Sequence, residues 1–213
     1  MRFHKLLLIV ILFLVSCSQK APIYEHKDFI FGTIVDIKIY GETEEKSENI
    51  SNLIFNDFKR LHNYLHPWEK SLISSMNNAI AAGSVFNVDD EEIIRIIQDN
   101  KNLASKSENY FNPAIGKLIA LWGFHQELPN QMVPKAHQIN ELLANITTMD
   151  DLKINQSTLS SANRNFQLDL GGYAKGYALD RAKKILANNG VANALVNIGG
   201  NIIAIGMHGD RSW

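Results

Sequence analysis

Residues 168–205 read LDLGGYAKGYALDRAKKILANNGVANALVNIGGNIIAI and carry the clearest structural signals of the chain. Apolar side chains recur at helical spacing from 177 to 186, and the Asn-Gly pair at 189–190 is a C-terminal stop, so a helix is predicted there. Two extended apolar runs follow, and the glycine pair at 199–200 between them predicts a hairpin or a bent strand. The stretch therefore predicts a helix followed by paired strands.

The beginning of this stretch has the composition of an anion site. A short apolar strand carrying one acid, Asp169, leads into the glycine pair 171–172 and then into the helix near residue 174. Such a turn would bring free backbone N–H groups, the positive end of a helix dipole and the Lys175 ammonium together, which favours phosphate. The pattern is neither a Walker loop nor GxGxxG, so an ordinary tight turn between strand and helix explains the spacing equally well.

Composition and charge describe an ordinary globular chain. Its 213 residues suffice for one good core or two small lobes, with 46% hydrophobic residues, 20% charged residues and a formal net charge of -1. There is neither a basic stripe nor an acidic tail, so nucleic acid is not an expected partner.

The N-terminus is typical of an exported bacterial lipoprotein. Arg2 and Lys5 precede the apolar run 6–15, which is too short to span a bilayer comfortably and has the organisation of an export signal. The run ends in Leu-Val-Ser-Cys, which resembles a lipobox in which Cys17 would be lipidated. Cys17 is the only cysteine; the alternative is a lone core cysteine beside an ordinary signal peptide.

These features divide the chain into three parts. We predict a signal peptide at 1–16, a lipidated cysteine and tether at 17–27, and a folded domain at 28–213. The expected location is the cell envelope, with the protein anchored to a bacterial membrane by lipid and facing the periplasm or the exterior.

The folded domain intermixes strand and helix patterns, which predicts an α+β fold with a mostly antiparallel sheet and flanking helices. Alternation predicts a strand over 29–40 bent at Gly32-Thr33, and helical periodicity predicts helices over 42–64, from 89 onward and over 136–144. The helix from 89 would bury one face: Ile93, Ile94, Ile96, Ile97 and Leu103.

Two histidines, His62 and His66, stand four residues apart at the end of the first predicted helix. That spacing can bind a metal ion on a helix. The pair lacks the glutamate of a zincin motif and runs directly into Pro67, so a solvated helix end is the preferred interpretation.

Aromatic residues mark two loops. Trp68 lies near the tip of one, and Tyr110 and Phe111 precede the Asn112-Pro113 turn of the other. Such rings can stack on a planar ligand, but aromatic anchors of a hydrophobic core would give the same pattern, and both interpretations stay open.

Four blocks, in this order, resemble the ApbE family, the FAD:protein FMN transferases. The first is Phe-Gly-Thr at 31–33, where the family has Met-Gly-Thr, and the second is Trp68 with the Ser-Leu-Ile-Ser-Ser-Met-Asn loop at 71–77. The third is Phe-Asn-Pro-Ala-Ile-Gly-Lys-Leu at 111–118 with Leu-Trp-Gly-Phe at 121–124, and the fourth is Asp-Leu-Gly-Gly-Tyr-Ala-Lys-Gly-Tyr-Ala at 169–178. With the lipobox, these blocks span nearly the whole chain.

The resemblance implies lobes around a flavin cleft. By position, FAD would be bound by seven side chains: Phe31, Trp68, Tyr110, Phe111, Asn112, Asp169 and Lys175. Lys175 would also be catalytic, and the main-chain carbonyl of Gly172 would be one ligand of Mg²⁺.

The implied reaction is Mg²⁺-assisted phosphoryl transfer. A Ser or Thr hydroxyl of an extracytoplasmic target protein attacks the FMN-side phosphorus of FAD, AMP leaves, and FMN becomes linked to the target by a phosphodiester. Subunits of membrane redox complexes are the implied targets.

The chain departs from the family pattern in three respects. Phe31 replaces a methionine, and Asn112 replaces an aspartate, which removes a negative charge. Family members continue beyond the equivalent of Trp213, where the other Mg²⁺ ligands, an Asp and a nearby Ser or Thr, and a histidine loop are expected. The resemblance thus implies a C-terminally truncated domain that binds Mg²⁺ poorly and transfers FMN slowly or not at all.

Three other functions stay open at this point. The chain could be a flavin-binding lipoprotein without transferase activity, or an FAD hydrolase in which water replaces the protein hydroxyl. An unrelated periplasmic solute-binding lipoprotein would share only the lipobox.

Overall fold

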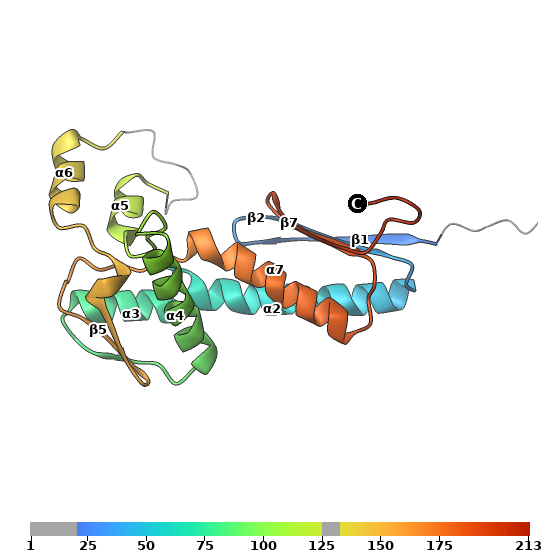
Figure 1. The fold of residues 1–213 in the computed structure, drawn as a ribbon, viewed down its shortest axis with the longest axis horizontal. Coiled ribbons are helices and arrows are strands. Elements are labelled where there is room, and N and C mark those ends of the chain that lie inside the picture. Colours follow the sequence, from blue (N-terminus) through green and yellow to red (C-terminus); the bar gives the residue numbers. More distant parts are fainter. Residues whose placement is uncertain (1–20, 125–132) are drawn as a thin grey trace, which may run out of the picture.

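The computed structural model describes residues 21–124 and 133–213, and Figure 1 shows an elongated molecule with a sheet toward one end and a cluster of helices at the other. These residues form two sheets, one of four strands and one of three. All the strand pairs are antiparallel, and helices flank both sheets. The predicted α+β class with mostly antiparallel sheet is therefore confirmed.

The larger sheet has the strand order β1-β2-β6-β7. Its strands are β1 (Ile23–Ile30), β2 (Thr33–Tyr40), β6 (Ala194–Ile198) and β7 (Asn201–Ile205). Buried residues of β2 pair with buried residues of β6, Val35 with Ile198 and Ile37 with Val196. Because side chains alternate along a strand, this register turns one face of the sheet into the core.

Two long helices, α2 (Glu44–Leu65) and α7 (Gly171–Asn188), cover the buried face of the sheet (Figure 1). Thr43 caps α2 by accepting the Lys46 N–H at 3.2 Å. With 22 residues, α2 is about 33 Å long and runs from beneath the sheet into the second lobe.

The second lobe contains the shorter elements. Its sheet has the order β3-β5-β4. Its elements are α3 (Leu72–Ala81), β3 (Phe86–Asn87), α4 (Glu91–Lys106), α5 (Gly116–Leu121), α6 (Ala136–Ala144), a 3-10 turn (Met149–Asp151), β4 (Leu152–Asn155) and β5 (Thr158–Ser161).

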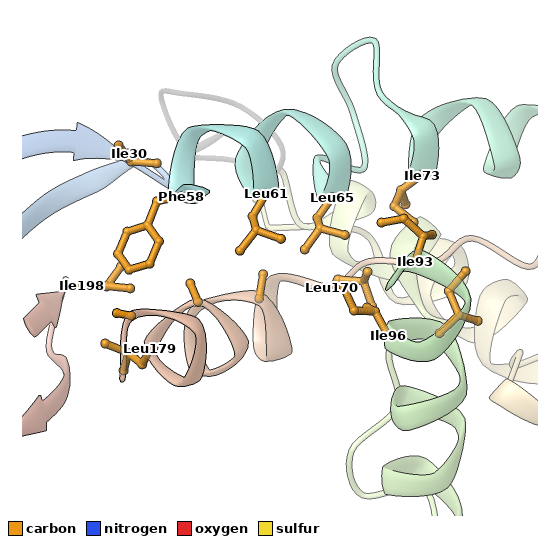
Figure 2. Close-up of a cluster of buried hydrophobic side chains, with 14 of the residues drawn as sticks. Ile30, Phe58, Leu61, Leu65, Ile73, Ile93, Ile96, Leu170, Leu179 and Ile198 are labelled. Carbon is orange, nitrogen blue, oxygen red and sulfur yellow. The ribbon is translucent and has the colours of Figure 1, made fainter. Parts of the chain in front are cut away.

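One continuous hydrophobic core joins the two lobes. In Figure 2, Phe58, Leu61 and Leu65 point from α2 toward α7, and Ile73 of α3 faces Ile93 of α4. The loops between the lobes are therefore anchored on both sides by packed side chains.

The predicted helices 42–64, from 89 onward and 136–144 correspond to α2, α4 and α6. In α4, Ile93, Ile96 and Ile97 are buried as predicted, whereas Ile94 is only partly buried and Leu103 is exposed. The buried stripe continues instead through residues 100 and 104, which share a helix face with Ile93 and Ile97.

Two predictions were wrong in their local structure. Residues 71–77 are not a loop, because Ser71 and Ser74 form a reciprocal capping box that starts α3. The predicted tether to residue 27 is too long, since β1 begins at Ile23 and pairs with β2 from there. As an edge strand with many exposed polar residues, β1 lacks the apolar alternation that would have revealed it.

The predicted signal peptide and Cys17 lie outside the described residues. No helix within 21–124 or 133–213 is long and apolar enough to cross a membrane.

Candidate functional site

A cleft of about 730 Å³ opens where the β1–β2 turn, the end of α2 and the start of α7 meet. It is large enough for a ligand of dinucleotide size. Its walls are apolar, aromatic and charged residues from several segments: Phe29, Phe31, Gly32, His62, Leu65, His66, Pro67, Trp68, Glu69, Phe124, Leu170, Gly171, Ala174 and Lys175.

Phe31 occupies an unusual backbone conformation at the edge of this cleft. Phe31 and Gly32 have φ of 57° and 68°, as the two-residue turn between β1 and β2 requires. A left-handed conformation costs a residue other than glycine roughly 1–2 kcal/mol. The Phe31 ring lies 5.9 Å from that of Phe58 and 5.7 Å from that of His62, between the core and the cleft. Strain held by surrounding packing is typical of functional sites.

The start of α7 differs from the predicted turn. The glycine pair 171–172 lies within the first turn of the helix, and neither glycine has positive φ. The Asp169 carboxylate accepts the Gly171 N–H at 2.7 Å, and the Leu170 carbonyl accepts the N–H groups of Tyr173 and Ala174. Among the described residues, only the Gly172 N–H of this turn is left without an acceptor. The predicted set of free N–H groups therefore shrinks to one.

Asp169 stands beside the cleft, next to the lining residues Leu170 and Gly171, and is not itself a lining residue. Its segment forms no regular strand, so the predicted short strand before the helix was wrong. Burial raises the pKa of the Asp169 carboxyl, and the hydrogen bond from Gly171 only partly offsets this. A buried carboxylate at a helix N-terminus stabilises the first turn, so Asp169 positions the helix start that faces the cleft.

Lys175 lines the cleft one turn into α7. The Lys175 ammonium makes no hydrogen bond or ion pair with any other described residue. An ammonium without a protein partner in a cleft is available to an anionic ligand.

The two histidines also line the cleft and are partly buried, so this helix end is less solvated than predicted. The rings of His62 and His66 lie edge to face at 5.3 Å. Burial, together with the neighbouring His66, lowers the pKa of His62, which favours its neutral form.

Tyr110, Phe111 and Asn112 are not cleft-lining residues. Tyr110 is 95% exposed, and Asn112 uses both ends of its amide locally, donating to the Thr147 carbonyl and accepting the Ala114 N–H. Phe111 lies against α7, because a Cβ added to Gly172 would come 3.5 Å from its ring. The structure thus brings Phe31, Trp68 and Lys175 together, places Asp169 and Phe111 beside them, and leaves Tyr110 and Asn112 outside.

No metal site is evident from the side chains. The described residues contain no group of three or more His, Cys, Asp or Glu side chains placed to hold a metal ion. The one Mg²⁺ ligand that the resemblance assigned within this chain is the main-chain oxygen of Gly172, which does not make a site by itself.

Sequence reasoning missed the role of Asn77. Its buried amide donates to the Leu168 carbonyl at 2.9 Å and accepts the Leu168 N–H at 2.8 Å. The side chain thus imitates a neighbouring strand and fixes the segment that leads into Asp169. A polar residue on the apolar face of α3 was the available signal.

An ion-pair cluster between α2, α4 and α7 was also missed. Arg181 donates to both Asp57 oxygens at 2.8 and 2.9 Å, and Arg60 joins Asp57 at 2.9 Å to Glu92 at 2.8 Å. Burial and a hydrogen bond to Glu92 raise the pKa of Tyr177 to about 12. The cluster ties together the three helices that carry most of the core.

The sequence and the fold were compared with known proteins. The ApbE family matches residues 31–213. A Rhodobacter capsulatus protein named FAD:protein FMN transferase is 35% identical over 92% of this chain and 37% of its own length. A Klebsiella pneumoniae protein of the same name is 30% identical over 86% of this chain and 56% of its own length.

Solved structures agree with these matches. The crystal structure of an ApbE protein from Thermotoga maritima superposes with a TM-score of 0.76, at 30% identity, covering 87% of this chain and 59% of that one. The flavin transferase ApbE from Vibrio cholerae has a TM-score of 0.77 at 25% identity, covering 89% and 61%. The chain therefore spans less than two thirds of each of these relatives.

Proposed function

Because this chain belongs to the ApbE family, we propose that its cleft binds FAD and that the chain transfers FMN from FAD to a Ser or Thr hydroxyl of a target protein, with release of AMP. The chain spans about a third to three fifths of the relatives it matches, so its activity and targets are part of this proposal.

One observation carries the proposal. A single cleft of about 730 Å³ combines two aromatic rings, Phe31 and Trp68, with the Lys175 ammonium near the start of an 18-residue helix. FAD has the matching polarity, since a flat heterocycle is joined to an anionic diphosphate. The aromatic walls would hold the ring system, and Lys175 with the Gly172 N–H would hold phosphate oxygens.

The reaction makes one bond and breaks one. The hydroxyl oxygen of the target attacks the FMN-side phosphorus, the bond from that phosphorus to the AMP phosphate breaks, and one proton is released. Lys175 would offset the negative charge that spreads over the phosphate oxygens. Asp169 would position the first turn of α7 and thereby Lys175.

Mg²⁺ is a proposed requirement inferred from family membership. The described side chains do not form a site for it, so we assign no step of the reaction to the ion. Transfer measured with added Mg²⁺ and again with a chelator tests this part separately.

We further propose that the chain is anchored through lipidated Cys17 and acts outside the cytoplasm on subunits of membrane redox complexes. The lipobox-like sequence before Cys17 supports the anchor. Mass spectrometry of the purified protein would show a diacylglyceryl group on Cys17, and an unmodified Cys17 after expression in a bacterium that processes lipoproteins would refute it.

The central test uses the full chain in mild detergent with FAD, Mg²⁺ and a candidate acceptor protein. We expect flavin binding by fluorescence and an acceptor mass raised by one FMN. AMP produced without any acceptor would indicate a hydrolase instead. Flavin bound without transfer or AMP would indicate a binding protein, and no flavin bound would refute the proposal.

A further inference from the structure

His66 has an unusually well-defined ring at the cleft wall. It ends α2, and its Nδ1 accepts two backbone N–H groups, from Trp68 at 3.2 Å and Glu69 at 2.9 Å. Ser71 also donates its hydroxyl to the His66 carbonyl. Side chain and backbone of His66 therefore organise the loop that carries Trp68.

These two hydrogen bonds determine which ring nitrogen carries the proton. A nitrogen that accepts hydrogen bonds has no proton of its own, so Nδ1 is unprotonated. The neutral imidazole must then carry its proton on Nε2. The loop thus fixes both the orientation of the ring and the position of its single N–H donor.

The Nε2–H of His66 is free to donate a hydrogen bond to a ligand. His66 lines the cleft, and its Nε2 makes no hydrogen bond within the described part of the chain. The Oε1 of Glu69 lies 4.0 Å from Nε2, beyond hydrogen-bond distance, and the Glu69 side chain is 76% exposed. The His66 ring also packs against the His62 ring in an edge-to-face contact.

We propose that the His66 Nε2–H donates a hydrogen bond to a phosphate oxygen of the dinucleotide. His66 supplies this donor from the end of α2, and Lys175 supplies a second one from α7. This inference rests on the proposed function, since it names a further ligand-binding residue in the same cleft. A neutral N–H held in a fixed position can donate to an anionic phosphate oxygen. Unlike a second cationic side chain, it would not form ion pairs with carboxylates of the protein. The diphosphate would then be held from two elements that belong to one packed core.

Two substitutions separate the two nitrogens. In His66→Asn, the side-chain oxygen can still accept the N–H groups at 68 and 69, as in an Asx turn before proline, but the cleft donor is lost. In His66→Gln, the amide N–H reaches about as far as Nε2, but the acceptor for the loop is lost. The two variants serve as reciprocal controls.

The probes are FAD, ADP and riboflavin, titrated against full-length wild-type and variant protein by calorimetry. We expect His66→Asn to weaken FAD and ADP binding about tenfold, to leave riboflavin binding unchanged, and to keep the thermal midpoint. His66→Gln should lose thermal stability but bind ADP more tightly than His66→Asn.

Other results would overturn the inference. Wild-type affinity in His66→Asn, with loss only in His66→Gln, would mean that His66 serves the loop alone. Weaker riboflavin binding with unchanged ADP binding would place the donor on the flavin ring. A wild-type protein that binds neither FAD nor ADP would refute the proposed function itself, a result distinct from the first two.

Discussion

Two of the cations on helix α7, Lys175 and Arg181, lie six residues apart and have opposite surroundings. Arg181 makes two hydrogen bonds to Asp57 and lies 3.3 Å from Glu92, inside the ion-pair cluster. Lys175 lines the cleft and has no partner among the described residues. The same helix is therefore ion-paired to its neighbours at Arg181 and presents an unpaired cation to the cleft at Lys175.

This difference separates stability from binding. Paired charges beside a packed core hold α2, α4 and α7 in register. The unpaired ammonium contributes nothing to that framework and is kept available to a ligand. The comparison predicts that substitutions at the two places change different measurements.

The largest effect is expected from Asp57→Ala. Asp57 has only 11% of its side chain exposed and bonds to both Arg60 and Arg181, so its removal leaves two guanidinium groups with Glu92 alone. We expect the free energy of unfolding to fall by about 2–3 kcal/mol, measured by urea denaturation. Exposed Asp180→Ala, on the same helix, is the control. A fall of less than about 0.5 kcal/mol in the free energy of unfolding of Asp57→Ala would show that the ion-pair cluster does not stabilise the packing of these helices.

Lys175→Met should weaken ligand binding and leave stability unchanged. The apolar stem is kept and only the charge is removed, so the midpoint of thermal unfolding should not change. FAD binding should weaken about tenfold or more, measured by flavin fluorescence. Lys183→Met, on an exposed part of α7, controls for net charge. Equal FAD affinity in Lys175→Met and Lys183→Met would contradict a specific role of Lys175 in binding.

Acidification tests the cluster through its carboxylates. Burial alone would raise the pKa of Asp57 and of Glu92, but hydrogen bonds from arginine and from Tyr177 outweigh it and hold both below their ordinary values of 3.8 and 4.5. A lowered pKa stabilises the fold above the unfolded-state pKa, and this stabilisation is lost as pH falls through the folded value. Unfolding followed between pH 6 and pH 3 should show a steeper loss below about pH 4.5 in wild type than in Asp57→Ala.

Asp169→Asn is expected to change stability little. Burial raises the pKa of this carboxyl, so its stabilising contribution is present below the unfolded-state pKa and is lost as pH rises through the folded value. Because Asn keeps an oxygen for the Gly171 N–H, stability at pH 7 should be unchanged or higher by a few tenths of a kcal/mol. FAD binding should be kept, because Asn still accepts the Gly171 N–H that positions the start of α7, and a large loss of stability would contradict this account.

Local patterns predicted the framework well. Helical spacing in α2 and α7 and alternation in β2 follow from burying one side of each element, so they are visible without knowledge of partners. The glycine pair 199–200 also marked the β6–β7 hairpin correctly.

The remainder depends on contacts between distant segments. Asn77 bonds to Leu168 across 91 residues and Arg181 to Asp57 across 124, and no local pattern encodes either pairing. The glycine pair 171–172 looked like a turn, but it begins a helix, in which Asp169 accepts the Gly171 N–H and Leu170 accepts the N–H groups of the two residues after the pair. His62 looked solvated because Phe31 of the β1–β2 turn, whose ring packs against it, lies about 30 residues earlier in the chain.

The distance along the chain between α2 and α7 also sets an order of events during synthesis. The apolar side of α2 leaves the ribosome more than 100 residues before α7, since Asp57 and Arg181 are 124 residues apart. At about 5–20 residues per second, this delay is roughly 6–25 s. During that time the apolar side of α2 can pack only against segments that are already made, and β1, which contacts α2 in the folded chain, is one of them.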